Sequence, residues 1–214
     1  MSLFELSPTE LRLLRRLNRP WKIQEYLDGL PINFERRGET CMSPRRVMRE
    51  KTAHCIEGAM FAALALRING HAPLLVDIET VPSDDAHVMA VFRQNGRWGA
   101  IHKTNHLALR YRDPVYTSIR ELVMSHFHEY ADGDGRKTMR SFTRPIHLRR
   151  FDAQGWMTDE DDLWYIAEYI ADVPHIPLLT RSHVSLLRPM SVFEAAMHRK
   201  TEWDRSGKRR RRIS

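Results

Sequence analysis

Residues 55–69 constrain this chain more than any other segment. The stretch is typical of a helix, and apolar side chains surround its axis on almost every side: Ile56, Ala59, Met60, Phe61, Ala62, Ala63, Leu64, Ala65, Leu66 and Ile68. A helix that is apolar all round belongs in the interior of a fold, where other elements cover it. Gly70 follows as a natural C-terminal stop. The sequence therefore predicts a fold organised around one buried helix.

Strand signals follow this helix directly. Residues 74–78 read as a buried strand, and residues 87–93 and 98–101 as two further strands. Asn95-Gly96 lies between the last two and is a strong signal for a two-residue hairpin turn. A central helix beside a hairpin sheet indicates the α+β class, with the helix packed on an antiparallel sheet.

Helical signals flank this core. Ser7-Pro8 and Ser43-Pro44 each place a capping serine before a proline at the first helical position. Further helices are expected over 117–130 and 162–171, and a turn over 111–114. We therefore divide the chain into a helical N-terminal region (1–42), a core (43–145), a largely helical C-terminal extension (146–204) and a basic, disordered tail (205–214).

The positive charge is concentrated in that tail. The formal net charge is +7, but the last ten residues contain Lys208, five arginines and no acid. Without those six charges the rest of the chain carries only +1. A nearly neutral body argues against a large nucleic-acid footprint. The run 208–212 is expected to be solvated, with a weak electrostatic contact to nucleic acid or an acidic surface as the alternative.

The chain is expected to be cytoplasmic. Charge interrupts the N-terminus within five residues, which is unlike a secretory signal, and no apolar run approaches the length of a membrane span. Two cysteines, Cys41 and Cys55, do not make a disulfide framework, and reduced thiols are the simpler interpretation.

Cys55 and His87 are the candidate chemical pair. Cys55 stands at the head of the buried helix, and His87 begins a strand 32 positions later. A helix N-terminus and a neighbouring imidazolium both favour the thiolate, which is the nucleophilic form of cysteine. Amide groups of the first helical turn can also stabilise a developing oxyanion. Glu57 is expected to interact with the helix N-terminus and to point away from the sulfur, and His54 is interpreted as a loop residue.

This arrangement resembles the transglutaminase-like superfamily of papain-like folds. Those proteins place a Cys at the head of a central helix, a His on a strand about thirty residues on, and then a strand with the pattern Trp-x-x-x-Asp-x-Thr. The present chain reads Trp98-Gly99-Ala100-Ile101-His102-Lys103-Thr104. Trp98 and Thr104 fit the pattern, whereas His102 occupies the position of the usual catalytic Asp. The resemblance covers roughly residues 43–105.

The residue that orients His87 is therefore open. His102 is favoured by alignment, although a neutral imidazole brings no negative charge. Asn105 offers an amide like that of papain-like Cys-His-Asn sites, but residues 102 and 105 face opposite sides of a strand. Asp77, on the neighbouring strand, and Asp113, in a loop, are further candidates.

The leading hypothesis is a cysteine-dependent acyltransferase or hydrolase acting on a peptide, amide or thioester. The resemblance implies Cys55 as nucleophile, His87 as base, and His102 or Asn105 as the orienting residue. Two alternatives stay open: a non-catalytic scaffold that retains the fold, and a nucleic-acid-associated protein acting through its tail. The histidine spacings match no zinc motif, so no metal and no cofactor are expected.

Overall fold

The computed structural model describes residues 5–210, and these residues form an α+β fold. The helices are α1 (Pro8–Arg16), α2 (Pro20–Asp28), α3 (Pro44–Glu50), α4 (Cys55–Ile68), α5 (Ile119–Met124), α6 (Trp164–Asp172), α7 (Arg181–Val184) and α8 (Val192–His198), with short 3₁₀ helices η1 (Phe127–Glu129) and η2 (Leu148–Gln154). The strands are β1 (Leu74–Thr80), β2 (His87–Gln94), β3 (Arg97–Ile101), β4 (Arg112–Tyr116), β5 (Met139–Thr143), β6 (Ile146–His147) and β7 (His175–Pro177).

The strands form one seven-stranded antiparallel sheet. Its order is β4-β3-β2-β1-β5-β7, and β6 pairs with β1 beside β5. The predicted hairpin is confirmed, since β2 and β3 pair up to Gln94 and Arg97 around a two-residue turn. Asn95 and Gly96 both have positive φ, at 47° and 78°, as a type I′ turn requires.

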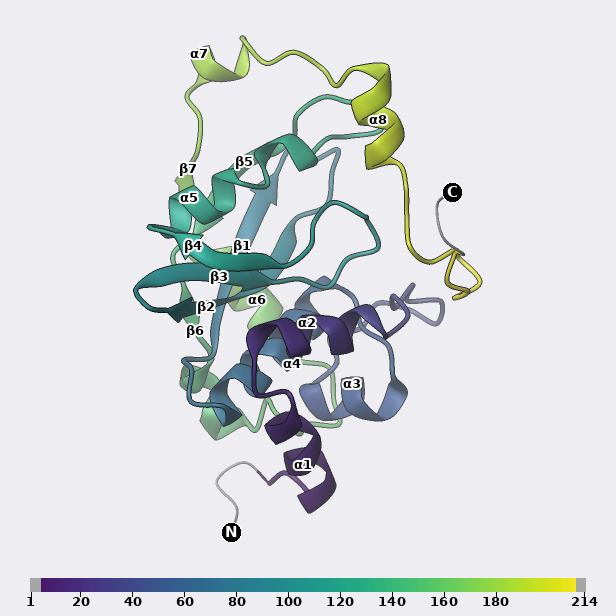
Figure 1. Ribbon diagram of the computed structural model, residues 1–214, viewed down its shortest axis with the longest axis vertical. Helices are drawn as coiled ribbons and strands as arrows, with labels where there is room; N and C mark the ends of the chain where they lie inside the picture. The colour runs from purple at the N-terminus through teal and green to yellow at the C-terminus, as the bar shows by residue number, and fades with distance from the viewer. Residues whose placement is uncertain (1–4, 211–214) are drawn as a thin grey trace.

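The sheet separates two apolar cores. Val88, Ala90 and Phe92 of β2 face the core that contains α4, whereas Met89 and Val91 face the core that contains α5. Figure 1 shows α1 to α4 below β2 and β3, and α5 on the other side, above β4. Nearly every residue of α4 from Ile56 to Leu66 is buried, which confirms the predicted central helix.

The second half of the chain differs from the prediction. Residues 112–116 form β4 rather than a turn, and Pro114 is tolerated because β4 is an edge strand of the sheet. The predicted helix over 117–130 is instead α5 followed by η1. The segment 146–204, expected to be largely helical, also contributes β6 and β7 to the sheet. The division into domains stays a prediction, but these strands tie the extension to the core.

The structure describes the basic tail as far as Arg210, and its expected disorder stays a prediction. Residues 205–210 form a turn, closed by a bridge between Trp203 and Arg209. Arg209 pairs with Glu202 and lies over the Trp203 ring. A cation beside both an acid and an aromatic ring holds the chain in place. The rest of the tail, 211–214, lies outside the described residues, as do residues 1–4 of the N-terminus.

Gly58 permits the close approach of α4 to the segment after β3. A Cβ at Gly58 would lie 2.3 Å from Cβ of Lys103 and 2.9 Å from its Cγ. Lys103 has little freedom to move, because it is 1% exposed and its Nζ donates to the carbonyls of Leu27 and Leu30. These contacts join α4, α2 and the end of β3 at one point.

We predict that Gly58→Ala destabilises the protein although alanine is the better helix former. Overpacking costs about 2 kcal/mol, which outweighs a propensity gain of about 1 kcal/mol. The melting temperature, followed by circular dichroism, should fall by roughly 3 °C. Gly133→Ala is the control, since a Cβ at Gly133 meets nothing within 4 Å. Equal melting temperatures for the two variants would contradict the close-packing argument.

Candidate active site

Cys55 and His87 lie at the same end of the sheet, where α4 and β2 both begin. The two residues line one cleft of about 210 Å³, together with residues from the segment after β3, from the end of η1 and from the C-terminal part of the chain. Thr104, Asn105, Tyr130 and His198 are among these lining residues. Cys55 is partly exposed, so its sulfur can be reached from this cleft.

The environment of Cys55 favours the thiolate. Burial opposes ionisation, but interactions with His54 and His87 outweigh it and lower the pKa of the thiol from 9.0 to about 6. As the first helical residue, Cys55 also lies at the positive end of the α4 dipole. As the first two residues of α4, Cys55 and Ile56 have amide groups without an acceptor inside the helix.

His54 is the residue immediately before Cys55, and it caps α4. Its Nδ1 lies 4.0 Å from Sγ of Cys55. Its Nε2 lies 2.8 Å from the carbonyl oxygen of Thr40 and 3.3 Å from Oε1 of Glu57. Despite burial, the contacts with Cys55 and Glu57 raise the pKa of His54 to about 11.

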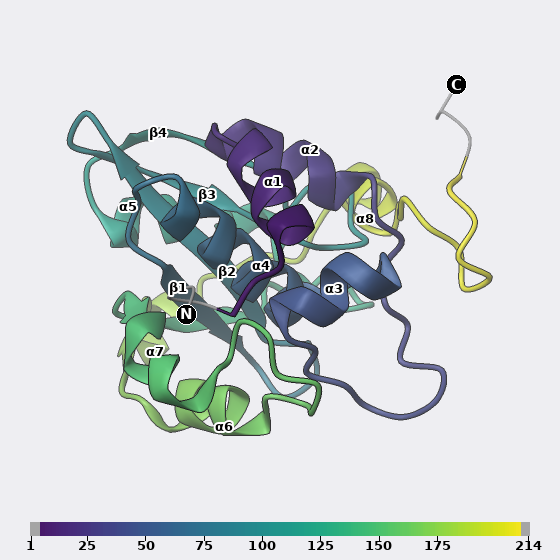
Figure 2. The same cartoon turned by 90° about the horizontal axis from the view of Figure 1, so that it is seen from below.

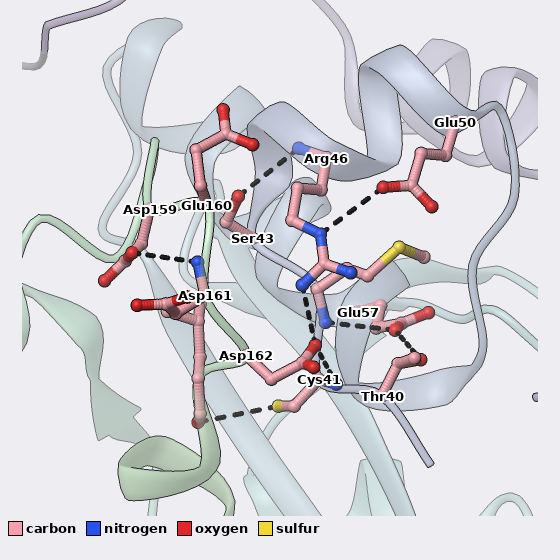
Figure 3. Close-up of polar contacts among 12 residues, drawn as sticks. Thr40, Cys41, Ser43, Arg46, Glu50, Glu57, Asp159, Glu160, Asp161 and Asp162 are labelled. Carbon is pink, nitrogen blue, oxygen red and sulfur yellow. Dashed lines mark hydrogen bonds and ion pairs between the residues drawn. The ribbon is translucent and has the colours of Figure 1, made fainter. Parts of the chain in front are cut away.

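Glu57 is a fully buried carboxylate held by several donors. Its Oε1 accepts from the Thr40 hydroxyl at 2.7 Å and from the Met42 amide at 3.0 Å, and its Oε2 accepts from the His54 amide at 2.9 Å. Figure 3 shows Glu57 turned toward Thr40 on the loop before α3. Burial opposes the charge, but these hydrogen bonds and the His54 ring lower the pKa of Glu57 to about 2.

His102 is the residue that contacts His87. Nε2 of His87 and Nδ1 of His102 are 3.1 Å apart, and the two rings are stacked with an interplanar angle of 12°. The strand register explains this contact. Ala90 pairs with Ile101, so the next residue, His102, lies opposite Met89. Met89 and His87 are two residues apart on β2, so all three side chains lie on the same face of the sheet. His102, the residue favoured by alignment, is thus the one that contacts His87.

The surroundings of His102 keep its ring neutral. Burial lowers the pKa of His102 well below 6.5, and the nearby His126, His87, Arg112 and Arg110 act in the same direction. The ring of His126 meets His102 edge-on at 4.7 Å between centroids. His126 in turn lies 3.4 Å from Glu129, which accepts two hydrogen bonds from Arg112. His102 therefore offers His87 a hydrogen bond but no charge.

The other candidates for the orienting residue are engaged elsewhere. The amide of Asn105 donates to the Trp203 carbonyl at 3.0 Å and accepts from the Trp203 amide at 2.8 Å, so it anchors the C-terminal segment beside the cleft. Asp77 lies 2.9 Å from Nε2 of His175. Asp113 lies on edge strand β4 rather than in a loop. Cys41 is fully buried and bonds the Leu163 carbonyl.

Sequence reasoning missed the part played by His54. The signal was present, because His54 and Glu57 occupy the N-cap and N3 positions of the buried helix, where a carboxylate reaches back to the capping residue. This pattern indicated a helix cap at His54, and not that His54 is a charged partner of the Cys55 thiol. His126 gave no such signal, because it reaches His102 only through the packing of α5 and η1 on the sheet.

No protein-family model matches the chain, and no curated protein matches it either. Within residues 5–210, no group of three or more His, Cys, Asp or Glu side chains could hold a metal ion. Over the same range, no helix combines the length and the apolar character needed to cross a membrane. The geometry of the site is therefore the main guide to the function of this protein.

We predict that Asn105→Ala loosens the segment 201–210. The variant loses two hydrogen bonds to the Trp203 backbone, each of which contributes about 1 kcal/mol. Amide hydrogen exchange in 201–210 should become roughly tenfold faster or more, measured by mass spectrometry. Asn18→Ala, which removes an exposed asparagine from the start of α2, should leave this exchange unchanged. Unchanged exchange in Asn105→Ala would mean that other contacts, such as Arg110 with Glu202, hold the segment.

Proposed function

We propose that this protein is a cysteine-dependent acyltransferase or amide hydrolase of transglutaminase-like type. One observation carries the proposal: a partly exposed cysteine at the start of a buried helix shares a cleft with His87, and His54 and His87 together outweigh burial and lower the pKa of its thiol. A thiolate in a cleft, beside a base and two free helix amides, is the arrangement that acyl transfer requires. The resemblance to transglutaminase-like proteins supports the same assignment.

The geometry supports a two-step reaction. The Cys55 sulfur attacks the carbonyl carbon of an amide or thioester, and the amides of Cys55 and Ile56 stabilise the oxyanion. His87 takes up the thiol proton and delivers it to the leaving nitrogen or sulfur as the carbonyl bond breaks. Water or an amine then gives its proton to His87, attacks the acyl-enzyme and regenerates Cys55.

His102 has a defined part in this scheme. For His87 to accept a proton at Nδ1, its Nε2 must carry hydrogen and donate it to Nδ1 of His102, 3.1 Å away. Because His102 is neutral, it can accept this bond and so holds the ring orientation and tautomer of His87. Both cysteines are free, which supports a reducing, cytoplasmic setting in which the thiol stays available.

The proposal predicts that Cys55→Ala and His87→Ala abolish acyl transfer. Purified protein would be offered thioester, activated-ester and peptide-amide acyl donors, and the acyl-enzyme would be sought by intact-mass spectrometry. We expect an adduct on Cys55 and a loss of turnover of about a thousandfold in either variant. Turnover that survives Cys55→Ala would contradict the proposal, and so would failure of every donor class to acylate Cys55. The second result would favour the non-catalytic scaffold.

A second prediction tests the orientation of His87. His102→Asn retains a hydrogen-bond acceptor near the position of Nδ1, whereas His102→Leu removes it. We expect the asparagine variant to keep most of the acylation rate and the leucine variant to lose roughly a hundredfold. Circular dichroism would establish that both variants are folded. Equal rates in the two variants would contradict a positioning role for His102.

A further inference from the structure

The histidine beside the sulfur that contacts a carboxylate is His54, not His87. His87 is supported by the uncharged ring of His102, with 3.1 Å between the two nitrogen atoms. His54 approaches Sγ of Cys55 at 4.0 Å through Nδ1, and its other nitrogen lies 3.3 Å from the buried Glu57. The acid that is missing at position 102 therefore has a counterpart in the site, behind a different histidine.

The groups around His54 favour its charged form. Nε2 of His54 faces the Thr40 carbonyl, the Glu57 carboxylate and, at 3.6 Å, the Glu35 carboxylate, all of which accept hydrogen bonds. On the other side, Nδ1 faces the Cys55 sulfur. The acceptors at Nε2 require hydrogen there, so a second hydrogen at Nδ1, which makes the ring an imidazolium, is the donor that a Cys55 thiolate would accept. A neutral thiol would instead donate to a bare Nδ1, and the two carboxylates near Nε2 favour the charged alternative.

Glu57 can keep this charge in place. It is fully buried, and hydrogen bonds from Thr40, Met42 and the His54 backbone fix its carboxylate. A buried carboxylate is stable only when it is paired and hydrogen-bonded, so the pair with His54 stabilises both partners. His87 also acts on the Cys55 thiol, and Cys41 and Tyr130 are further titratable groups that interact with Cys55.

We infer that His54, held protonated by Glu57, is a positioning residue that stabilises the Cys55 thiolate, whether the thiol proton passes to His87 or to solvent. His54 then stays charged throughout turnover, and His87 alone carries the moving proton. The role in turnover rests on the proposed function, but the ionised state of Cys55 does not. The assignment implies that Cys55 reacts with electrophiles near neutral pH even when His87 is removed.

The test measures the ionisation of Cys55 directly. The rate of Cys55 alkylation by iodoacetamide would be followed against pH, with the labelled peptide identified by mass spectrometry, and thiolate absorbance would be recorded in parallel. We expect the midpoint of the wild-type profile near pH 6. Because a depressed thiol pKa means that thiolate forms at lower pH, reactivity rises through this midpoint and not near 9.0.

Three variants separate the two histidines. His54→Gln and Glu57→Gln should raise the midpoint by about 1 to 3 units, since each removes the charge pair beside the sulfur. His87→Gln should raise it by less. Glu35→Gln is the matched control, a second carboxylate near His54 that lies farther away and is more exposed, and it should change the midpoint least. If only His87→Gln raises the midpoint, the inference is overturned.

If a variant fails to fold, a measurement on the wild-type protein still tests the inference. Histidine NMR should show the His54 ring still doubly protonated at a pH well above 6.5, because its pKa is raised. A neutral His54 at neutral pH would overturn the inference. Neither readout needs turnover, so a protein that transfers no acyl group but shows the low midpoint would contradict the proposed function alone.

Discussion

The burial of α4 determines where everything else in this protein lies. The helix is apolar on all sides, and it is covered by the sheet on one side and by α1, α2 and α3 on the others. Gly58 brings its first turn against Lys103, so the start of the helix lies at the end of β3. Figure 2 shows α4 beside α1, α2 and α3, and Cys55, its first residue, lines the cleft. A residue at the head of such a helix is both half-buried and close to partial positive charge.

Patterns that are local in sequence carried most of the fold prediction. The continuous apolar run predicted α4, and Asn95-Gly96 between two apolar segments predicted the β2–β3 hairpin. The short strands β6 and β7 could not be found in this way. Each is only two or three residues long and is defined by its pairing with β1 or β5 far away in the chain, not by a pattern of its own.

The candidate site is likewise predictable where it depends on local sequence patterns and not where it depends on distant contacts. The meeting of Cys55, His87 and His102 depends on one helix start and one hairpin register, both of which the sequence indicates. The sequence does not indicate the charged surroundings of His54. It marks Glu57 as a helix-capping residue, but the burial of Glu57 depends on the loop that contains Thr40 and Met42. Whether a carboxylate is exposed or buried decides if it is a solvated cap or a strong electrostatic partner.

The loop at residues 40–42 consequently links the thiol to distant parts of the chain. Thr40 and Met42 bind Glu57, while the Cys41 amide donates to Asp162 at 2.9 Å and the Cys41 carbonyl accepts from the Leu163 amide at 2.8 Å. Asp162 also pairs with Arg46 of α3 (Figure 3). A shift of α3 or of the chain before α6 would therefore move the donors that keep Glu57 ionised, and with them the charge beside Cys55. The N-terminal region and the C-terminal extension are in this sense parts of the site, because the loop that binds Glu57 is itself held by Asp162 and Leu163.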